Sequence, residues 1–258
     1  MSSSRPSIAE LRDVCQPQSI MGRVSAEHWA GRLYGRQLSI YLTRWLLPTR
    51  ITPDGVTWLM ILSGLSAAAL LTVPQLWAAV LVVLLIQAQL ILDCSDGEIA
   101  RWRRKTGAAG VYLDRIGHYT TDAGMVAALG VRADGGFGSI DGWTTLGLAT
   151  AVLVLVIKSE TDLVHVARAY AGKPVVSDEE AEMKPRGLRS IRSLIAYFPF
   201  HRALLAIELS LLCLIAAVVD QLTGELIASQ VLAIVLVCVA VLVAGGHLLS
   251  ILVSRRLR

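Results

Sequence analysis

The chain has little charge and few cysteines. Charged residues make up only 17% of its 258 residues, whereas hydrophobic residues make up 54%. Several apolar stretches approach the roughly 20 residues that a helix needs to cross a bilayer, which favours an integral membrane protein over a soluble one. The four cysteines show no paired spacing, so we expect neither a disulfide framework nor a zinc site. The polar opening lacks an apolar core segment, so we expect no cleavable signal peptide.

The basic residues are unevenly distributed. The net charge is +4, which in a membrane protein indicates topology and attraction to anionic lipid rather than nucleic-acid binding. Nearly all basic residues lie before the first span, in the 101–105 turn, in the 158–202 region and in the tail 255–258, and the opposite loops hold almost only Arg132. The positive-inside rule therefore predicts a multi-pass protein of the cell membrane with both termini in the cytoplasm.

Apolar runs predict an all-α membrane protein with two parts. We expect residues 1–50 to form an N-terminal segment and residues 51–258 to form a six-helix transmembrane domain. The expected spans are 55–73, 76–95, 108–131, 142–160, 201–220 and 228–253. In the N-terminal segment, apolar and aromatic residues recur at helical spacing: Tyr34, Leu38, Tyr41, Leu42 and Trp45. This pattern predicts an amphipathic helix at the membrane surface, with a helix that faces the cytosol as the alternative.

Acidic residues gather where the second and third spans meet. On a continuous helix the following residues share one face: Asp93, Asp96, Gly97, Ala100 and Arg101. On the next span Gly110, Asp114 and His118 are each one turn apart. A short turn makes the two helices neighbours, so their polar faces can meet.

Three acids that converge at a membrane edge would repel one another strongly without a cation. Mg²⁺ takes carboxylate oxygens and often binds together with substrate phosphates. Small residues among the acids leave room for a ligand or for close helix packing, and Arg101 can pair with a phosphate or a base carbonyl. The alternative is a polar packing seam of Asp–Arg pairs. Glu98 points away from these acids, and we expect it to be solvated or interfacial.

The run resembles the signature of the CDP-alcohol phosphotransferase family, also called the CDP-alcohol phosphatidyltransferases. Seven of its eight fixed positions match with correct gaps, and the eighth, an Asp in the family, is His118 here. Pro53, Asp54 and Thr57 also resemble the Pro-Asn-x-x-Thr start of the family's first span.

The resemblance implies a homodimeric transferase that moves a substituted phosphate from a CDP-linked donor to an alcohol and releases CMP. It implies a site open to the cytoplasm with a divalent cation, Mg²⁺ or Mn²⁺. The implied metal ligands are Asp93, Asp96 and Asp114, with His118 in the fourth position. The implied CDP-binding residues are Thr57, Asp93, Gly97, Ala100 and Arg101.

The histidine at the fourth position changes the chemistry. In the family this acid is a candidate second-metal ligand and a candidate base, and Asp114 is the other candidate catalytic residue. An imidazole can act as ligand or as base, but it supplies no negative charge. His118 therefore favours one metal or a softer ion such as Mn²⁺ over a pair of Mg²⁺ ions. Asp122, one turn further on, is an alternative carboxylate.

The acceptor side is less specific. Lys158, Asp162 and His165 form a polar stripe below the fourth span, and Arg115 lies beside Asp114. We interpret Arg115 and Lys158 as acceptor-binding residues, whereas the basic cluster 184–192 favours a solvated face with lipid contacts.

Two other functions fit parts of the pattern. An intramembrane prenyltransferase also binds diphosphate through acids and Mg²⁺, but its motifs and span count fit poorly. A catalytically impaired CDP-binding protein, or a carrier, would account for the missing fourth acid. Glu208 is expected well inside the fifth span, where an acid marks ion paths, but one acid alone makes a poor path.

Overall fold

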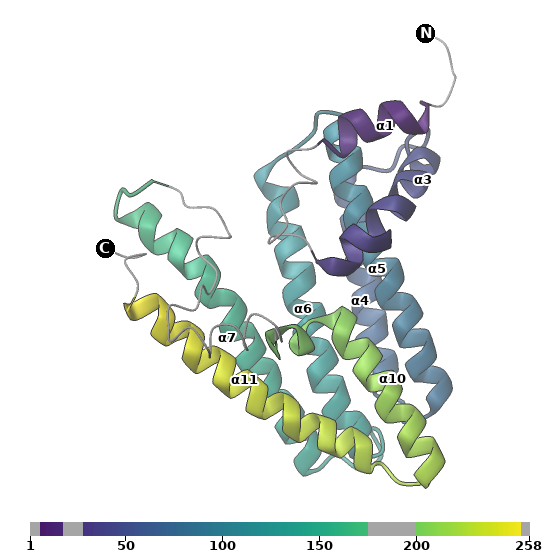
Figure 1. The fold of residues 1–258 in the computed structure, drawn as a ribbon, viewed down its shortest axis with the longest axis vertical. Coiled ribbons are helices and arrows are strands. Elements are labelled where there is room, and N and C mark those ends of the chain that lie inside the picture. Colours follow the sequence, from purple (N-terminus) through teal and green to yellow (C-terminus); the bar gives the residue numbers. More distant parts are fainter. Residues whose placement is uncertain (1–5, 18–27, 175–199, 254–258) are drawn as a thin grey trace. The chain divides into compact units, whose positions relative to one another are not determined.

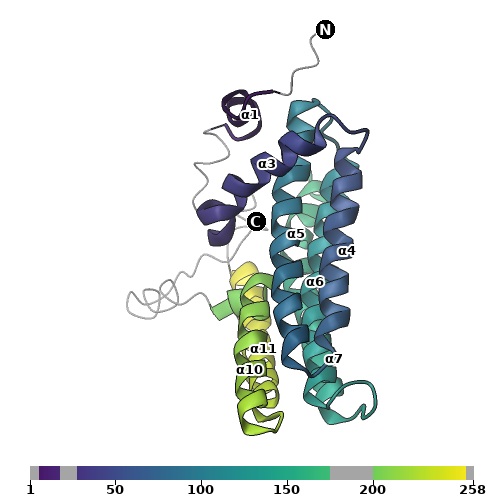
Figure 2. The same ribbon diagram turned by 90° about the vertical axis from the view of Figure 1, so that its right-hand side faces the viewer.

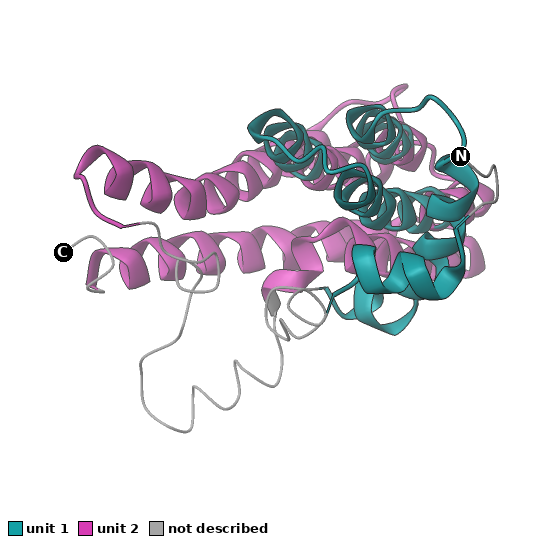
Figure 3. Cartoon of the chain, turned by 90° about the horizontal axis from the view of Figure 1, so that it is seen from above, with its two compact units in different colours: residues 1–66, 84–118 teal, residues 67–83, 119–258 magenta. Residues whose placement is uncertain are grey.

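The computed structural model describes residues 6–17, 28–174 and 200–253, and within these residues the chain is all-helical (Figure 1). The basic cluster 184–192 lies outside the described residues. The chain forms two compact units (Figure 3). Unit 1 comprises residues 1–66 and 84–118, and unit 2 comprises residues 67–83 and 119–258. Each unit is described by itself.

The helices follow one another in chain order. Their bounds are α1 Ile8–Cys15, a short π-helix Gly31–Gly35, α3 Arg36–Leu46, α4 Pro53–Leu71, α5 Leu76–Trp102, α6 Ala108–Ala133, α7 Gly142–Tyr170, a 3₁₀ turn Phe200–Leu204, α10 Ala206–Thr223 and α11 Ile227–Val253. The all-helical prediction is thus confirmed over the described residues.

Six long helices lie where spans were expected. Within the described residues, five of them are long and apolar enough to cross a membrane, namely α4, α5, α7, α10 and α11. The helix α6 is not among these five, because polar residues such as Asp114 and His118 interrupt its apolar run. Its assignment as a sixth span stays a prediction.

Three helix boundaries differ clearly from the expected ones, and the first is the end of α7, which continues to Tyr170 instead of residue 160. The helix α5 continues without a break to Trp102, so the whole acidic run lies on one helix, as its spacing required. The helix α10 begins at Ala206, because Phe200–Leu204 forms a separate 3₁₀ turn. Glu208 therefore lies in the first turn of α10, and its expected position well inside a span was wrong.

The N-terminal segment contains a helix, α1, that was not expected. Its first turn is closed by a capping box, in which Ser7 Oγ accepts from the Glu10 amide (3.1 Å) and Glu10 Oε2 accepts from the Ser7 amide (2.9 Å). Leu11 and Cys15 are buried against Ile40 of α3. The Ser-x-x-Glu spacing was a readable start signal.

The helix α3 occupies most of the segment where an amphipathic helix was expected. Ser39, Ile40, Thr43 and Leu46 are buried on one face, whereas the exposed large hydrophobics are Leu38, Tyr41 and Trp45. This exposed apolar stripe suits a membrane surface. Its position there stays a prediction, as does the domain boundary at residue 50.

In unit 2, α11 packs against both α7 and α10. Figure 2 shows α11 behind α10. The helices α6 and α7 approach most closely at two glycines. A Cβ atom at Gly130 would lie 2.5 Å from the Trp143 carbonyl oxygen, and one at Gly147 would lie 2.8 Å from Gly130 Cα. Only glycine permits this backbone contact, which fixes α7 against α6.

Arg132 is a fully buried structural residue rather than a loop charge (0% exposed). Its Nη1 donates to the Val73 carbonyl and its Nη2 to the Pro74 carbonyl, both at 2.7 Å. Its Nε donates to Ser229 Oγ at 3.3 Å. Arg132 thus joins the end of α6 to the turn after α4 and to the start of α11.

Arg132→Ala is expected to destabilise the protein by about 3 kcal/mol or more, because it leaves two carbonyls without donors in a buried place. Thermal unfolding in detergent micelles measures this as a lower Tm. Arg168→Ala is the matched control, because Arg168 donates to the exposed carbonyl of Pro174 rather than to buried carbonyls. Equal Tm values for the two variants would contradict the assigned role.

Candidate functional site

The acidic run lies on the accessible face of α5. Asp93, Asp96, Gly97, Ala100 and Arg101 are all partly exposed. The residues between them are buried: Cys94, Ser95, Glu98 and Ile99. The helix thus turns one face into unit 1 and presents the other, with its acids, to a ligand, as the i, i+3, i+4 spacing predicted.

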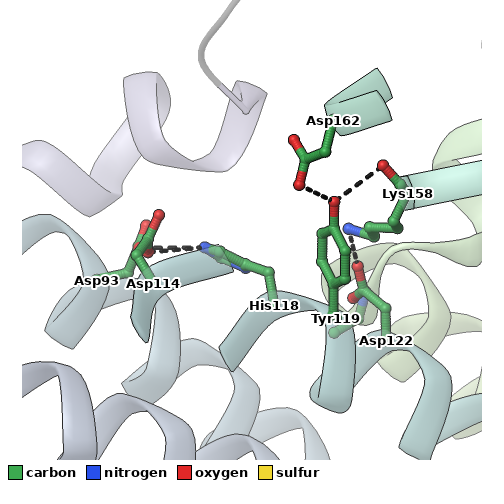
Figure 4. Close-up of polar contacts among 8 residues, drawn as sticks. Asp93, Asp114, His118, Tyr119, Asp122, Lys158 and Asp162 are labelled. Carbon is green, nitrogen blue, oxygen red and sulfur yellow. Dashed lines mark hydrogen bonds and ion pairs between the residues drawn. The ribbon is translucent and has the colours of Figure 1, made fainter. Parts of the chain in front are cut away.

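Asp93, Asp114 and His118 converge in unit 1 (Figure 4). His118 Nε2 lies 3.2 Å from Asp93 Oδ1 and 3.4 Å from Asp114 Oδ1. One ligand atom from each residue lies within 4.8 Å of the other two. Because Asp114 and His118 are one turn apart on α6, the two helices bring three donors to one point, but Asp96, which was expected to converge with Asp93 and Asp114, is not one of them.

Asp96 is held by a different partner. Thr57 Oγ1 donates to Asp96 Oδ2 at 2.7 Å, and Thr57 is itself buried at the start of α4. The structure therefore brings Thr57 to the acidic run, but it does not include Asp96 in the three-residue cluster. The role of Asp96 as a metal ligand stays a prediction.

The guanidinium group of Arg101 has one nitrogen held by a hydrogen bond and another without a partner among the described residues. Its Nε donates to the Cys15 carbonyl at 2.7 Å. Its Nη2 is buried and has no hydrogen-bond partner among the described residues. A buried guanidinium donor without a partner is costly, so this atom points to a ligand that is an acceptor.

Glycines keep the space around these side chains open. A Cβ atom at Gly97 would lie 3.1 Å from Arg101 Nη1, so the guanidinium rests directly over Gly97. A Cβ atom at Gly110 would lie 3.5 Å from Asp54 Oδ1. At Gly110 this is an ordinary van der Waals distance, and it shows that the start of α6 lies beside the start of α4 within unit 1.

Glu98 is not solvated, contrary to expectation. It is fully buried (0% exposed) and accepts hydrogen bonds from Gln16, Ser39 and Thr43. Its direction away from the acidic face was correctly read. The error arose because the helical wheel does not show that α3 and the residues after α1 cover that side.

In unit 2, Lys158 pairs with Asp122 (Figure 4). Lys158 Nζ lies 2.5 Å from Asp122 Oδ2, and Asp122 Oδ1 accepts from the Ala206 amide at 2.8 Å. Both oxygens of Asp122 are therefore bonded, which disfavours it as a substitute metal ligand. Tyr119 donates to Asp162 Oδ2 at 2.5 Å. Sequence reasoning missed Tyr119, for which no motif signal exists.

The described residues thus combine helices of membrane-spanning length, a cluster of donors that could hold a metal ion, and an arginine nitrogen without a hydrogen-bond partner. The family model described as CDP-alcohol phosphatidyltransferase matches residues 50–242, and the chain belongs to this family. It is thus a multi-pass membrane protein of a family that transfers phosphate-linked groups from CDP-alcohols in lipid synthesis. No curated protein matches the chain.

Proposed function

We propose that the protein transfers a substituted phosphate from a CDP-linked donor, CDP-diacylglycerol or another CDP-alcohol, to an alcohol acceptor and releases CMP. The observation that carries the proposal is the convergence of Asp93, Asp114 and His118, with their ligand atoms within 4.8 Å of one another. Family membership supplies the reaction class.

The three donors fit one small divalent cation. Ligand atoms lie about 2.0–2.2 Å from such an ion, so they lie about 3–4 Å apart, close to the separations seen here. Two carboxylates and one imidazole suit Mn²⁺ as well as Mg²⁺. A cation bound there supplies charge neutralisation at the donor's diphosphate and polarises the phosphorus under attack.

His118 acts in this proposal as a ligand, because the nitrogen that faces Asp93 also faces Asp114. A ligand nitrogen has no free lone pair with which to accept a proton. Asp114 is then the proton acceptor for the attacking alcohol. As the oxygen–phosphorus bond forms, the bond from that phosphorus to the CMP oxygen breaks, and CMP leaves.

The other residues of α5 orient the nucleotide. Arg101 Nη2 has no partner among the described residues, so it can donate to a phosphate oxygen or to the pyrimidine carbonyl. Gly97 and Ala100 leave room for the ligand beside the helix. Thr57 holds one oxygen of Asp96 and so fixes that carboxyl group at the edge of the CDP site.

For the acceptor we propose Arg115 and Lys158. The Lys158 ammonium group has three N–H donors, of which the ion pair with Asp122 uses one, so it can also donate to a polyol hydroxyl. We propose further that the protein is a homodimer in the cell membrane with both termini cytoplasmic, and that it serves phospholipid or lipid-linked polyol synthesis. The distribution of basic residues supports that topology.

The test is CMP release by the purified protein with Mg²⁺ or Mn²⁺ and a panel of CDP-linked donors and alcohols. We expect CMP to form only when metal, donor and acceptor are all present. CDP binding without CMP from any pair would instead support the impaired binding protein that the histidine at position 118 suggests. Absence of both CDP binding and CMP would contradict the proposed function.

A further inference from the structure

The buried carboxyl group of Glu98 joins three separate segments of unit 1. Its Oε1 accepts from Ser39 Oγ at 2.6 Å and from Gln16 Nε2 at 2.7 Å. Its Oε2 accepts from Thr43 Oγ1 at 2.7 Å. Ser39 and Thr43 belong to α3, Gln16 follows α1, and Glu98 itself lies in the middle of the acidic run of α5.

Further hydrogen bonds hold this junction, which consists of Glu98 with Gln16, Ser39 and Thr43. Gln16 Nε2 also donates to the Arg36 carbonyl at 2.7 Å, and Ser95 Oγ donates to the Ser39 carbonyl at 3.3 Å. Burying a carboxyl group costs free energy unless its oxygens accept hydrogen bonds, and an apolar residue would fill the same space at a lower free-energy cost. A role in placing its partners accounts for an acid at this position.

The junction lies one residue from a contact of the proposed nucleotide site. Cys15, the neighbour of Gln16, is fully buried, and its carbonyl accepts from Arg101 Nε at 2.7 Å. Burial and the nearby Glu98 carboxyl group raise the pKa of the Cys15 thiol to about 11. The thiol therefore stays neutral, so Cys15 holds Arg101 through its carbonyl rather than through a charge.

We propose that Glu98 is a positioning residue for Arg101. By holding Gln16 and α3, it fixes the Cys15 carbonyl, which turns the Arg101 guanidinium so that Nη2 meets the CDP moiety. The N-terminal helix α1, which precedes the family match at residues 50–242, is then part of the nucleotide site. This inference rests on the proposed function, because it assumes that CDP binds beside Arg101.

The experiment measures CDP affinity, with Mg²⁺ present, for four proteins: wild type, Glu98→Gln, Arg101→Gln and the double variant. Glutamine has the shape of glutamate, but its amide NH₂ group is a hydrogen-bond donor. It would face groups that donate to Glu98 in the wild type, namely those of Gln16, Ser39 and Thr43. We expect CDP to bind about tenfold more weakly to Glu98→Gln, the effect of one misplaced charge-assisted bond. The double variant should bind CDP no more weakly than Arg101→Gln alone, because Glu98 acts through Arg101.

A purely structural role would not give this coupling. Asp220→Asn is the matched control, since Asp220 is a buried acid in unit 2 that accepts from Ser229 Oγ and the Ala228 amide. It should lower the Tm and leave CDP affinity unchanged. If Glu98→Gln does not fold, Gln16→Ala takes its place, because it removes the bonds that Gln16 makes to Glu98 and to the Arg36 carbonyl and leaves the bonds from Ser39 and Thr43 to Glu98.

Three outcomes overturn the inference, and they are distinguishable. Wild-type CDP affinity in Glu98→Gln, or in Gln16→Ala where that variant replaces it, contradicts the positioning role while the proposed function stands. Additive losses in the double variant contradict action through Arg101. Failure of the wild-type protein to bind CDP contradicts both the proposed function and this inference.

Discussion

Asp93→Asn is expected to release CMP about 10³-fold more slowly than the wild type, or slower still, which is the largest effect expected in the site. Asparagine has the shape of aspartate but lacks its charge, so the cluster loses one of two carboxylates. Asp93 Oδ1 lies 3.2 Å from His118 Nε2 on the accessible face of α5. The measurement is the rate of CMP release at saturating donor and metal.

Asp141→Asn is the matched control for this loss. Asp141 precedes α7 and makes no side-chain bond to cap it, so its charge should have no effect on turnover. Turnover of Asp93→Asn above a tenth of the wild-type rate, at equal Tm, would show that the cluster is not where the reaction occurs.

His118→Ala is expected to reduce turnover about 10²-fold or more, since it removes one of the three donors that hold the cation. His118→Asp, which restores the acid of the family signature, should recover much of the activity. It should also shift the preference from Mn²⁺ toward Mg²⁺, because a carboxylate is the harder ligand. Rates with each metal measure both effects.

The control for this pair is His28→Ala. His28 Nδ1 accepts from the nearby Ala30 amide, and His28 lies outside the cluster, so turnover should not change. Full activity of His118→Ala would show that His118 is not a ligand of the catalytic metal ion. If His118→Asp and the wild type show the same preference between Mn²⁺ and Mg²⁺, then His118 does not determine the choice of metal.

The features that could be predicted from the sequence are local ones. Apolar runs located the six long helices, and i, i+3, i+4 spacing placed Asp93, Asp114 and His118 on faces that meet. Both signals depend only on helix geometry and on which helices are neighbours in the chain. They do not depend on how distant segments pack.

The features that were missed depend on distant partners. Glu98 was judged solvated because its three partners, which include Gln16 and Thr43, lie far away in the sequence. Asp122 was a candidate ligand because neither Lys158 nor the Ala206 amide is near it along the chain. No periodicity shows such contacts, since they form only when helices pack.

Some errors were of another kind, because the local signal was present. Ser7 and Glu10 mark the start of α1 by their spacing, yet the short helix lacks the apolar length that identifies a span. Glu208 was placed too deep because polar residues before Ala206 form a 3₁₀ turn instead of continuing the helix. Helix ends are less strongly encoded than helix centres.

The most direct test of the account is pulsed electron paramagnetic resonance of Mn²⁺ bound to the protein with CDP. We predict that one and the same ion shows coupling to phosphorus of the diphosphate and to nitrogen of His118, and that the nitrogen coupling disappears in His118→Asp. An ion coupled to phosphorus alone in the wild-type protein, unchanged in Asp93→Asn, would contradict the account.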